Sequence, residues 1–315
     1  MHKKRSLYYS TIDMSQLGQV QDNLDDNSLA VAFTALYLAG GPRSYSPNVR
    51  KWPQVEHVLR RHGVCVEALR RHGLYAEALL LEDAAVCCWA ERQVASGKAL
   101  TVFSSSYPAS WLRKLGTAAP PALWVQGQFP KALAVGIVGS RTPATASKAF
   151  AEACAARAAE AGMALVSGGA SGCDAVAMAA YVQSSGDQGL AVLPRGLLNS
   201  DVCPNVCAAS LEAPGAPFNR LSALHRNVLV YALSDAVIVI QPRFREGGTW
   251  HGAMEALRRR LSRVFVMSEP GNPACLALQS LGASSMPVSA ALCLADFTNS
   301  LESPRVQPSL FPQAV

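Results

Sequence analysis

Short apolar segments alternate with helical segments along the second half of this chain, and small residues separate them. We expect strands at residues 132–138, 163–166, 190–193, 236–240 and 263–267, and helices at residues 144–161, 174–182, 203–212, 222–233 and 250–260. Most of these strands are apolar on both faces, which is typical of parallel strands that helices cover on both sides. The pattern predicts an α/β fold with a doubly wound, mostly parallel sheet.

The remainder of the chain divides into three expected regions. Its 315 residues suffice for two domains at about 150 residues each. Residues 28–100 have helical periodicity and predict a small helical N-terminal domain, ahead of the sheet domain at residues 101–296. Residues 1–27 are polar and aperiodic, and residues 297–315 are rich in Ser, Pro and Gln, so we expect a flexible arm and a flexible tail.

A near-repeat lies within the helical region. Residues 61–69 (RHGVCVEAL) resemble residues 71–79 (RHGLYAEAL), ten positions later. Glycine at the same place in each copy predicts two short helices joined by tight turns. Such a helix-hairpin unit is found both in structural bundles and in proteins that bind the DNA backbone, so both interpretations stay open.

Composition excludes several classes of protein. Half of the residues are apolar and 16% are charged, which argues against a disordered chain. The longest apolar stretches, residues 29–41 and 228–240, are shorter than the roughly 18 residues of a membrane-spanning helix. The basic start, residues 1–5, precedes a polar segment, so no signal peptide is expected. The net charge of +6 permits a polyanionic partner without requiring one.

The nine cysteines are scattered, and none forms a Cys-x-x-Cys pair. Cys203 and Cys207 come closest to metal-ligand spacing, but no second pair of Cys or His accompanies them. We therefore expect no metal and no other cofactor. Reduced thiols are typical of cytoplasmic proteins, and a cytoplasmic location is expected.

Turns of small residues follow three of the expected strands. They are Gly139-Ser140-Arg141, Gly168-Gly169-Ala170-Ser171-Gly172 and Gly247-Gly248-Thr249. The carboxyl ends of parallel strands share one edge of a sheet, so these turns should meet there. Glycine lets N–H groups approach a ligand, and a helix N-terminus adds partial positive charge. Together the turns predict a phosphate-binding site, although each alone is also typical of tight strand–helix packing.

Polar side chains accompany these turns. Arg141 is placed to bind a phosphate or to form a surface salt bridge. Arg226 and Asn227 begin the helix before the strand at residues 236–240, and the Asn is suited to read a base edge or to hold the backbone. Asp174 follows the second turn, where a carboxylate most simply stabilises a helix N-terminus. The chain contains neither a dinucleotide fingerprint, nor a P-loop, nor a nucleophile–base motif, so we expect a protein without catalytic activity.

These motifs together resemble the DprA/Smf family of DNA-processing proteins. The resemblance rests on residues 107–108, 120–127, 137–141, 167–175, 191–197, 226–227, 233–240, 247–249 and 270–271, in order and at similar spacing. It implies a Rossmann-like domain that binds single-stranded DNA without sequence preference, forms a homodimer and delivers the strand to the recombinase RecA in transformation or recombination. By motif, the DNA pocket would include Gly139 to Arg141, Gly168 to Gly172, and Arg226 with Asn227.

This chain departs from the family pattern at three places. The family usually has a basic residue where Ser171 stands and an Arg where Val228 stands, and it more often has Ser-Gly-Ser where this chain has Gly247-Gly248-Thr249. Fewer cations in the pocket should weaken phosphate contacts and flatten the salt dependence of binding.

A second motif lies near the end of the chain. Gln307, Leu310 and Phe311 match the Q-x-x-L-F pattern of peptides that bind the bacterial replication sliding clamp. Such peptides bind as extended segments whose apolar side chains enter a pocket. A chance match and packing against the parent domain are the alternatives.

A second function also stays open. Phosphoribohydrolases of the LOG type resemble the same architecture and have Glu three positions after the Thr of a glycine-rich turn. This chain has Gly252 three positions after Thr249, which argues against glycosidic hydrolysis. A nucleotide-binding sensor in a defence or mobile-element system would not need that Glu.

Overall fold

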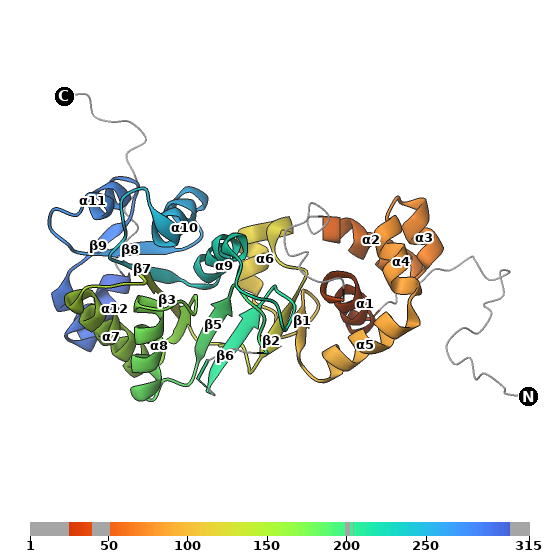
Figure 1. Ribbon diagram of the computed structural model, residues 1–315, viewed down its shortest axis with the longest axis horizontal. Helices are drawn as coiled ribbons and strands as arrows, with labels where there is room; N and C mark the ends of the chain where they lie inside the picture. Colours follow the sequence, from red (N-terminus) through yellow and green to blue (C-terminus); the bar gives the residue numbers. More distant parts are fainter. Residues whose placement is uncertain (1–24, 40–50, 199–201, 204, 303–315) are drawn as a thin grey trace, which may run out of the picture.

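The computed structural model describes residues 25–39, 51–198, 202–203 and 205–302, and Figure 1 shows two groups of elements. Helices α1 to α5 lie together at one end of the molecule. The sheet and its covering helices form the remainder, with strands β1 and β2 between the two groups.

The sheet has nine strands in the described part of the chain, in the order β1-β2-β6-β5-β4-β3-β7-β8-β9. Their bounds are β1 Ala99–Thr101, β2 Ala122–Gln126, β3 Ala134–Gly139, β4 Ala164–Ser167, β5 Gly189–Leu193, β6 Val206–Ser210, β7 Ala236–Ile240, β8 Arg263–Met267 and β9 Ser284–Met286. The pairs β1–β2 and β2–β6 are antiparallel, and all other neighbours are parallel. The prediction of a mostly parallel sheet is confirmed.

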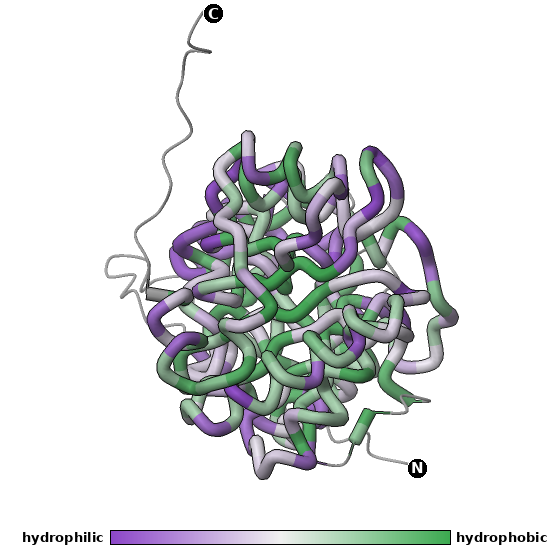
Figure 2. The backbone as a smooth tube through the Cα atoms, turned by 90° about the vertical axis from the view of Figure 1, so that its left-hand side faces the viewer, coloured by the Kyte–Doolittle hydropathy of each residue, from purple (hydrophilic) through white to green (hydrophobic). Residues whose placement is uncertain are grey.

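Helices cover both faces of this sheet, as the doubly wound prediction requires. One face packs against α6 (Ala109–Leu115), α9 (Arg220–Leu233), α10 (Gly247–Arg259) and α11 (Pro273–Ser280). The other packs against α7 (Thr145–Glu160), α8 (Cys173–Gln183) and α12 (Leu294–Glu302). Figure 2 shows hydrophobic segments through the middle of the molecule and hydrophilic segments mainly near its surface.

Strand β7 shows why the apolar pattern produces two covered faces. Successive side chains of a strand point to opposite sides. Val237 and Val239 belong to the core on the α9 side, whereas Ile238 and Ile240 belong to the core on the α7 side. All four are fully buried, so a polar residue at any of them would lose contact with water without gaining a partner.

The helical group has a core of its own. It consists of α1 (Asp26–Leu38), α2 (Trp52–His62), α3 (Val66–Arg71), α4 (Tyr75–Glu82) and α5 (Ala84–Ala95). Phe33, Leu59 and Leu69 are fully buried at its centre. At the boundary, Trp89 of α5 meets Trp124 of β2 edge to face, with ring centroids 5.7 Å apart. This contact and the packing of Leu38 against β1 and β2 join the helices to the sheet.

Two boundaries differ from the sequence predictions. Residues 203–212 were predicted to be helical, but residues 206–210 form strand β6. The segment reads VCAAS, and its alanines favour a helix locally, whereas pairing with β5 and β2 buries all five residues as a strand. The predicted tail at residues 297–315 overlaps α12, in which Phe297 and Leu301 are buried. The division into domains stays a prediction.

The predicted arm and the tail motif are not part of this description. Residues 1–24 and 303–315, which include Gln307, Leu310 and Phe311, lie outside the described residues. No helix in the described ranges combines the length and the apolar character needed to cross a membrane.

Trp111 of α6 provides a test of the core. It is fully buried, its Nε1 donates to the carbonyl of Leu229 at 3.0 Å, and its ring packs against Tyr107 and Phe129. We expect Trp111→Ala to lower the free energy of unfolding by about 3–5 kcal/mol in urea denaturation, because it leaves a large cavity. The exposed neighbour Arg113→Ala is the control, and equal midpoints for the two variants would contradict this packing.

Candidate functional site

A cleft of about 640 Å³ opens at the carboxyl ends of β3 and β7. After β3 the chain continues through α7 to β4 on one side, and after β7 it continues through α10 to β8 on the other. Connections that leave in opposite directions open a crevice at this point in doubly wound sheets, which is where their ligands bind. The first and third predicted turns, Gly139-Ser140-Arg141 and Gly247-Gly248-Thr249, both line the cleft.

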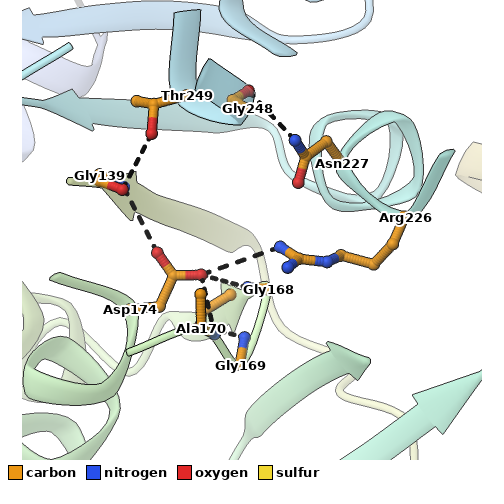
Figure 3. Close-up of polar contacts among 10 residues, drawn as sticks. Gly139, Gly168, Gly169, Ala170, Asp174, Arg226, Asn227, Gly248 and Thr249 are labelled. Carbon is orange, nitrogen blue, oxygen red and sulfur yellow. Dashed lines mark hydrogen bonds and ion pairs between the residues drawn. The ribbon is translucent and has the colours of Figure 1, made fainter. Parts of the chain in front are cut away.

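The buried carboxylate of Asp174 connects the first and second turns through hydrogen bonds (Figure 3). It accepts hydrogen bonds from the backbone N–H groups of Gly139 (3.3 Å), Gly168 (3.1 Å) and Ala170 (3.4 Å). Its Oδ2 lies 3.8 Å from Nη1 of Arg226 on α9. One side chain therefore holds two of the turns and a helix in place.

The third turn is attached to the same group of residues. Thr249 Oγ1 donates to the carbonyl of Gly139 at 2.9 Å, and Asn227 Nδ2 donates to the carbonyl of Gly248 at 3.1 Å. Figure 3 shows these bonds linking α10 to β3 and α9. All three turns thus meet at one rim, as the strand order predicts.

Burial dominates the electrostatics of this group. The side chains of Asp174 and Arg226 are 4% and 7% exposed. Burial raises the pKa of Asp174, while Arg226 and the three N–H donors act in the opposite direction. Burial likewise lowers the pKa of Arg226, and Asp174 opposes that shift. Each charge is therefore stable in the interior only because the other is present.

Two buried polar groups at the floor of the cleft have no hydrogen-bond partner among the described residues. They are Nε of Arg226 and the hydroxyl of Tyr231, and both residues line the cleft. Buried polar groups are normally paired, and these two atoms are shielded from solvent, so they lie behind the cleft surface. Burial also raises the pKa of Tyr231, which keeps its hydroxyl protonated and able to donate.

Glycine is required at two positions of the second turn. A Cβ at Gly168 would overlap Nη1 of Arg226, and a Cβ at Gly172 would overlap the carbonyl oxygen of Ser140. Gly172 also has φ of +81°, which other residues rarely adopt. The glycines here allow close packing of the turns, which is the alternative that the sequence left open.

Several backbone amides of the predicted turns already have hydrogen-bond acceptors within the protein. The N–H groups of Gly139, Gly168 and Ala170 donate to Asp174, and that of Gly169 donates to Ser167 Oγ at 3.2 Å. Phosphate contact by these amides stays a prediction, since each already has an acceptor. Of the second turn only Ala170 lines the cleft; Ser171 and Gly172 belong to the turn but not to the lining.

The start of α10 differs from the other turns. It begins at Gly247 with no side-chain hydrogen bond at its N-cap, and Gly247 and Gly248 are exposed at the cleft. The first N–H groups of a helix have no partner within it, and they attract anions. Of the three turns, this one is the most open to solvent.

Cations surround that helix start. Arg141, Arg220 and Arg243 are exposed, line the cleft and form no ion pair with a described acidic residue. Arg141 lies over the ring of Phe218, with its guanidinium carbon 5.6 Å from the centroid. Glu246, the N-cap residue of α10, lines the same cleft and is exposed.

Sequence reasoning missed Arg220 and Arg243 as site residues. A signal for Arg243 was present, because it stands three positions after the end of β7, where ligands of such sheets bind. Arg220 opens α9, and only the fold shows that this helix start faces the cleft. Within the described ranges, no three His, Cys, Asp or Glu side chains gather as metal ligands would.

A family model described as DNA recombination-mediator protein A matches residues 98–298. The chain belongs to this family. The match covers the sheet, its helices and the whole cleft. The family resemblance predicted from the motifs is confirmed.

Solved structures agree on the fold of this DprA-family chain. DNA processing protein A (DprA) of Streptococcus pneumoniae superposes with a TM-score of 0.61 at 20% identity, over 88% of this chain and 99% of that one. DNA processing protein A of Helicobacter pylori gives 0.52 at 24% identity, over 65% and 95%. The Helicobacter protein has a unique single-stranded DNA binding mode. No curated protein sequence matches the chain.

The central ion pair provides a test of the site's architecture. We expect Asp174→Asn to lower the free energy of unfolding by about 3–5 kcal/mol, because it leaves Arg226 buried without a counter-charge. Adding Arg226→Met should restore part of the loss. Urea denaturation of both single variants and the double variant measures this coupling. The exposed Asp187→Asn is the control, and a single Asp174→Asn variant as stable as that control would contradict the assigned role.

Proposed function

We propose that this chain binds single-stranded DNA in the cleft between β3 and β7 and acts as a non-catalytic mediator of DNA recombination. The observation that carries the proposal is the arrangement of three arginines without ion pairs around the uncapped start of α10. Membership in the recombination-mediator family, and the single-stranded DNA binding described for the Helicobacter relative, support the identity of the ligand.

Phosphate is the group that suits this arrangement. The N–H groups at the start of α10 donate to an anion, and the guanidinium groups of Arg141, Arg220 and Arg243 donate in pairs to phosphate oxygens. Asp174 and Arg226 are buried positioning residues, and their ion pair holds the turns in place.

The bases would find an apolar surface beside the phosphates. Phe218, 48% exposed, and Leu224 of α9, 45% exposed, both line the cleft. Aromatic and apolar surfaces stack any base, so they favour binding without sequence preference. For Asn227 the sequence left two roles open, contact with a base edge or support of the backbone. Its Nδ2 donates to the carbonyl of Gly248, which favours the second role.

Arg220 and Arg243 offset the departures from the family pattern. Ser171 is exposed outside the cleft lining and Val228 is half-buried, so neither supplies the usual cation. Three arginine–phosphate contacts correspond to a salt slope of about −2 for a single strand. The protein should therefore bind measurably, with moderate salt dependence.

The family supports two finer proposals. One is that the protein is a homodimer, and the other is that it delivers the strand to RecA in recombination or transformation. The alternative of a nucleotide-binding sensor or LOG-like phosphoribohydrolase would place a mononucleotide in the same cleft. A free nucleotide offers fewer phosphates to three separate arginines than a strand does.

Arg141 provides the direct test. We expect Arg141→Ala to weaken binding to labelled oligo-dT about tenfold and to reduce the salt slope by about 0.7, because one phosphate contact is lost. Fluorescence anisotropy at two salt concentrations measures both quantities. Arg113→Ala, an exposed arginine of α6, is the control.

Two outcomes would contradict the proposal. One is unchanged affinity and slope for the Arg141 variant. The other is that the wild-type protein does not bind oligo-dT but binds a nucleoside monophosphate, which would favour the nucleotide-binding sensor.

We also propose that the peptide with Gln307, Leu310 and Phe311 binds the replication sliding clamp. Support comes from the sequence pattern alone, since these residues lie outside the described ranges. We expect deletion of residues 307–311 to abolish recovery of the clamp in a pull-down, because both apolar anchors are lost. Equal recovery with the deleted and full chains would remove the proposal.

A further inference from the structure

The near-repeat of the helical region places two matching groups of side chains on one surface. In the first copy Arg61 and His62 end α2, and in the second copy Arg71 and His72 end α3. Gly63 and Gly73 follow them with φ of +71° and +74°. The rings of His62 and His72 lie 5.9 Å apart at an angle of 38°. The repeat is thus a spatial pair as well as a sequence pair.

This surface is positively charged without nearby compensation. We define the helical cationic surface by five exposed residues: His57, Arg61, His62, Arg71 and His72. None of them forms an ion pair with a described acidic residue.

The arginines next to this surface behave differently. Arg60 pairs with Glu56 at 3.0 Å and with Asp26 at 3.1 Å. Arg70 pairs with Glu67 at 2.7 Å and also with Glu82. Asp26, Glu56, Glu67 and Glu82 are therefore paired with Arg60 or Arg70, whereas the next residue of each helix, Arg61 or Arg71, forms no ion pair with a described acidic residue.

The charges of the surface repel one another. The pKa of His62 lies below its ordinary value of 6.5, because of partial desolvation and of the positive charges of Arg61, His72, Arg71 and His57, in that order. Repulsion of this kind does not stabilise a fold. It favours a surface that binds an anion, which would relieve it.

Helix C-termini explain only part of the arrangement. Basic residues in a last turn interact favourably with the helix dipole, and the last turns hold Arg60, Arg61 and His62 in α2 and Arg70 and Arg71 in α3. The dipole does not require two helix ends to bring their cations to one surface. Convergence of the ends is what a ligand with regularly spaced negative charges would require.

We propose that the helical cationic surface is a second contact for the phosphate backbone of the nucleic-acid strand. This inference rests on the proposed function for the identity of the ligand. The surface belongs to α2 and α3, at the end of the molecule away from α11 and β9, whereas the cleft lies among β3, β7 and α10 (Figure 1). A short strand would occupy the cleft alone, and a longer one would reach both surfaces.

The test compares strand lengths in the full chain. We expect Arg61→Gln with Arg71→Gln to weaken binding to an oligo-dT of about 60 nucleotides about tenfold, and to leave binding to about 8 nucleotides unchanged. The salt slope for the long strand should fall by about 1.4, which is two contacts at about 0.7 each. Arg92→Gln with Lys98→Gln, two exposed cations of the same region, is the matched control and should behave as wild type.

The outcomes separate this inference from the proposed function. If wild type binds both strands, Arg141→Ala weakens both, and the Arg61/Arg71 variant binds the long strand as wild type does, the second contact is wrong and the cleft stands. If wild type binds neither strand, both proposals fail. If only the Arg61/Arg71 variant loses affinity, the helical surface is the DNA site and the cleft proposal fails.

A second measurement uses protonation. Lowering the pH from about 7.5 to about 5.5 charges histidines whose ordinary pKa is about 6.5, so long-strand affinity should rise. The histidines of the sheet domain are the same in every variant, so only the difference between variant and wild type is assigned to the helical cationic surface. We expect His62→Gln to bind as wild type at the higher pH and to lose part of the rise. An identical rise in variant and wild type would contradict a role for this histidine.

Discussion

The carboxylate of Asp174 is the interaction on which the site depends. It is buried, and it accepts N–H donors from the ends of two strands while it faces the guanidinium of Arg226. Water would solvate each of these groups in the unfolded chain, so burying them costs free energy. That cost is offset only when all of them are paired with one another. The glycine at 168 follows from the same constraint, since any side chain there would displace Arg226.

This inner network leaves the outer rim free for a ligand. The polar groups that hold the turns point inward, and the arginines at the rim are exposed and without ion pairs. The start of α10 lies between the two layers, joined to the network through Thr249 and Asn227 and open on its other side. Support of the fold and the proposed DNA binding are therefore assigned to different residues, so the rim cations can vary without loss of the fold.

Much of the fold was predictable because the central strands β3 and β7 are rich in valine and isoleucine. β7, with the sequence AVIVI, has no helical alternative of comparable burial. β6, with the sequence VCAAS, could also form a helix locally. It is a strand because it pairs with both β5 and β2. The meeting of the turns also followed from strand order. That Asp174 would occupy the amides of Gly139 and Gly168, and that Arg220 would face the cleft, depends on packing between distant segments, which local patterns do not encode.

The contact between Trp89 and Trp124 would have a consequence for a strand that contacts both proposed surfaces. It fastens α5 to β2, while Leu38 packs on the same edge of the sheet, so the helices rest on an extension of the sheet itself. A polymer that touched both the rim and the distant helices would have to cross a span built into the protein. The shortest strand able to contact both surfaces would then depend on the Trp89–Trp124 contact. Weakening that contact would make this minimum length less sharply defined, while each surface kept its own residues.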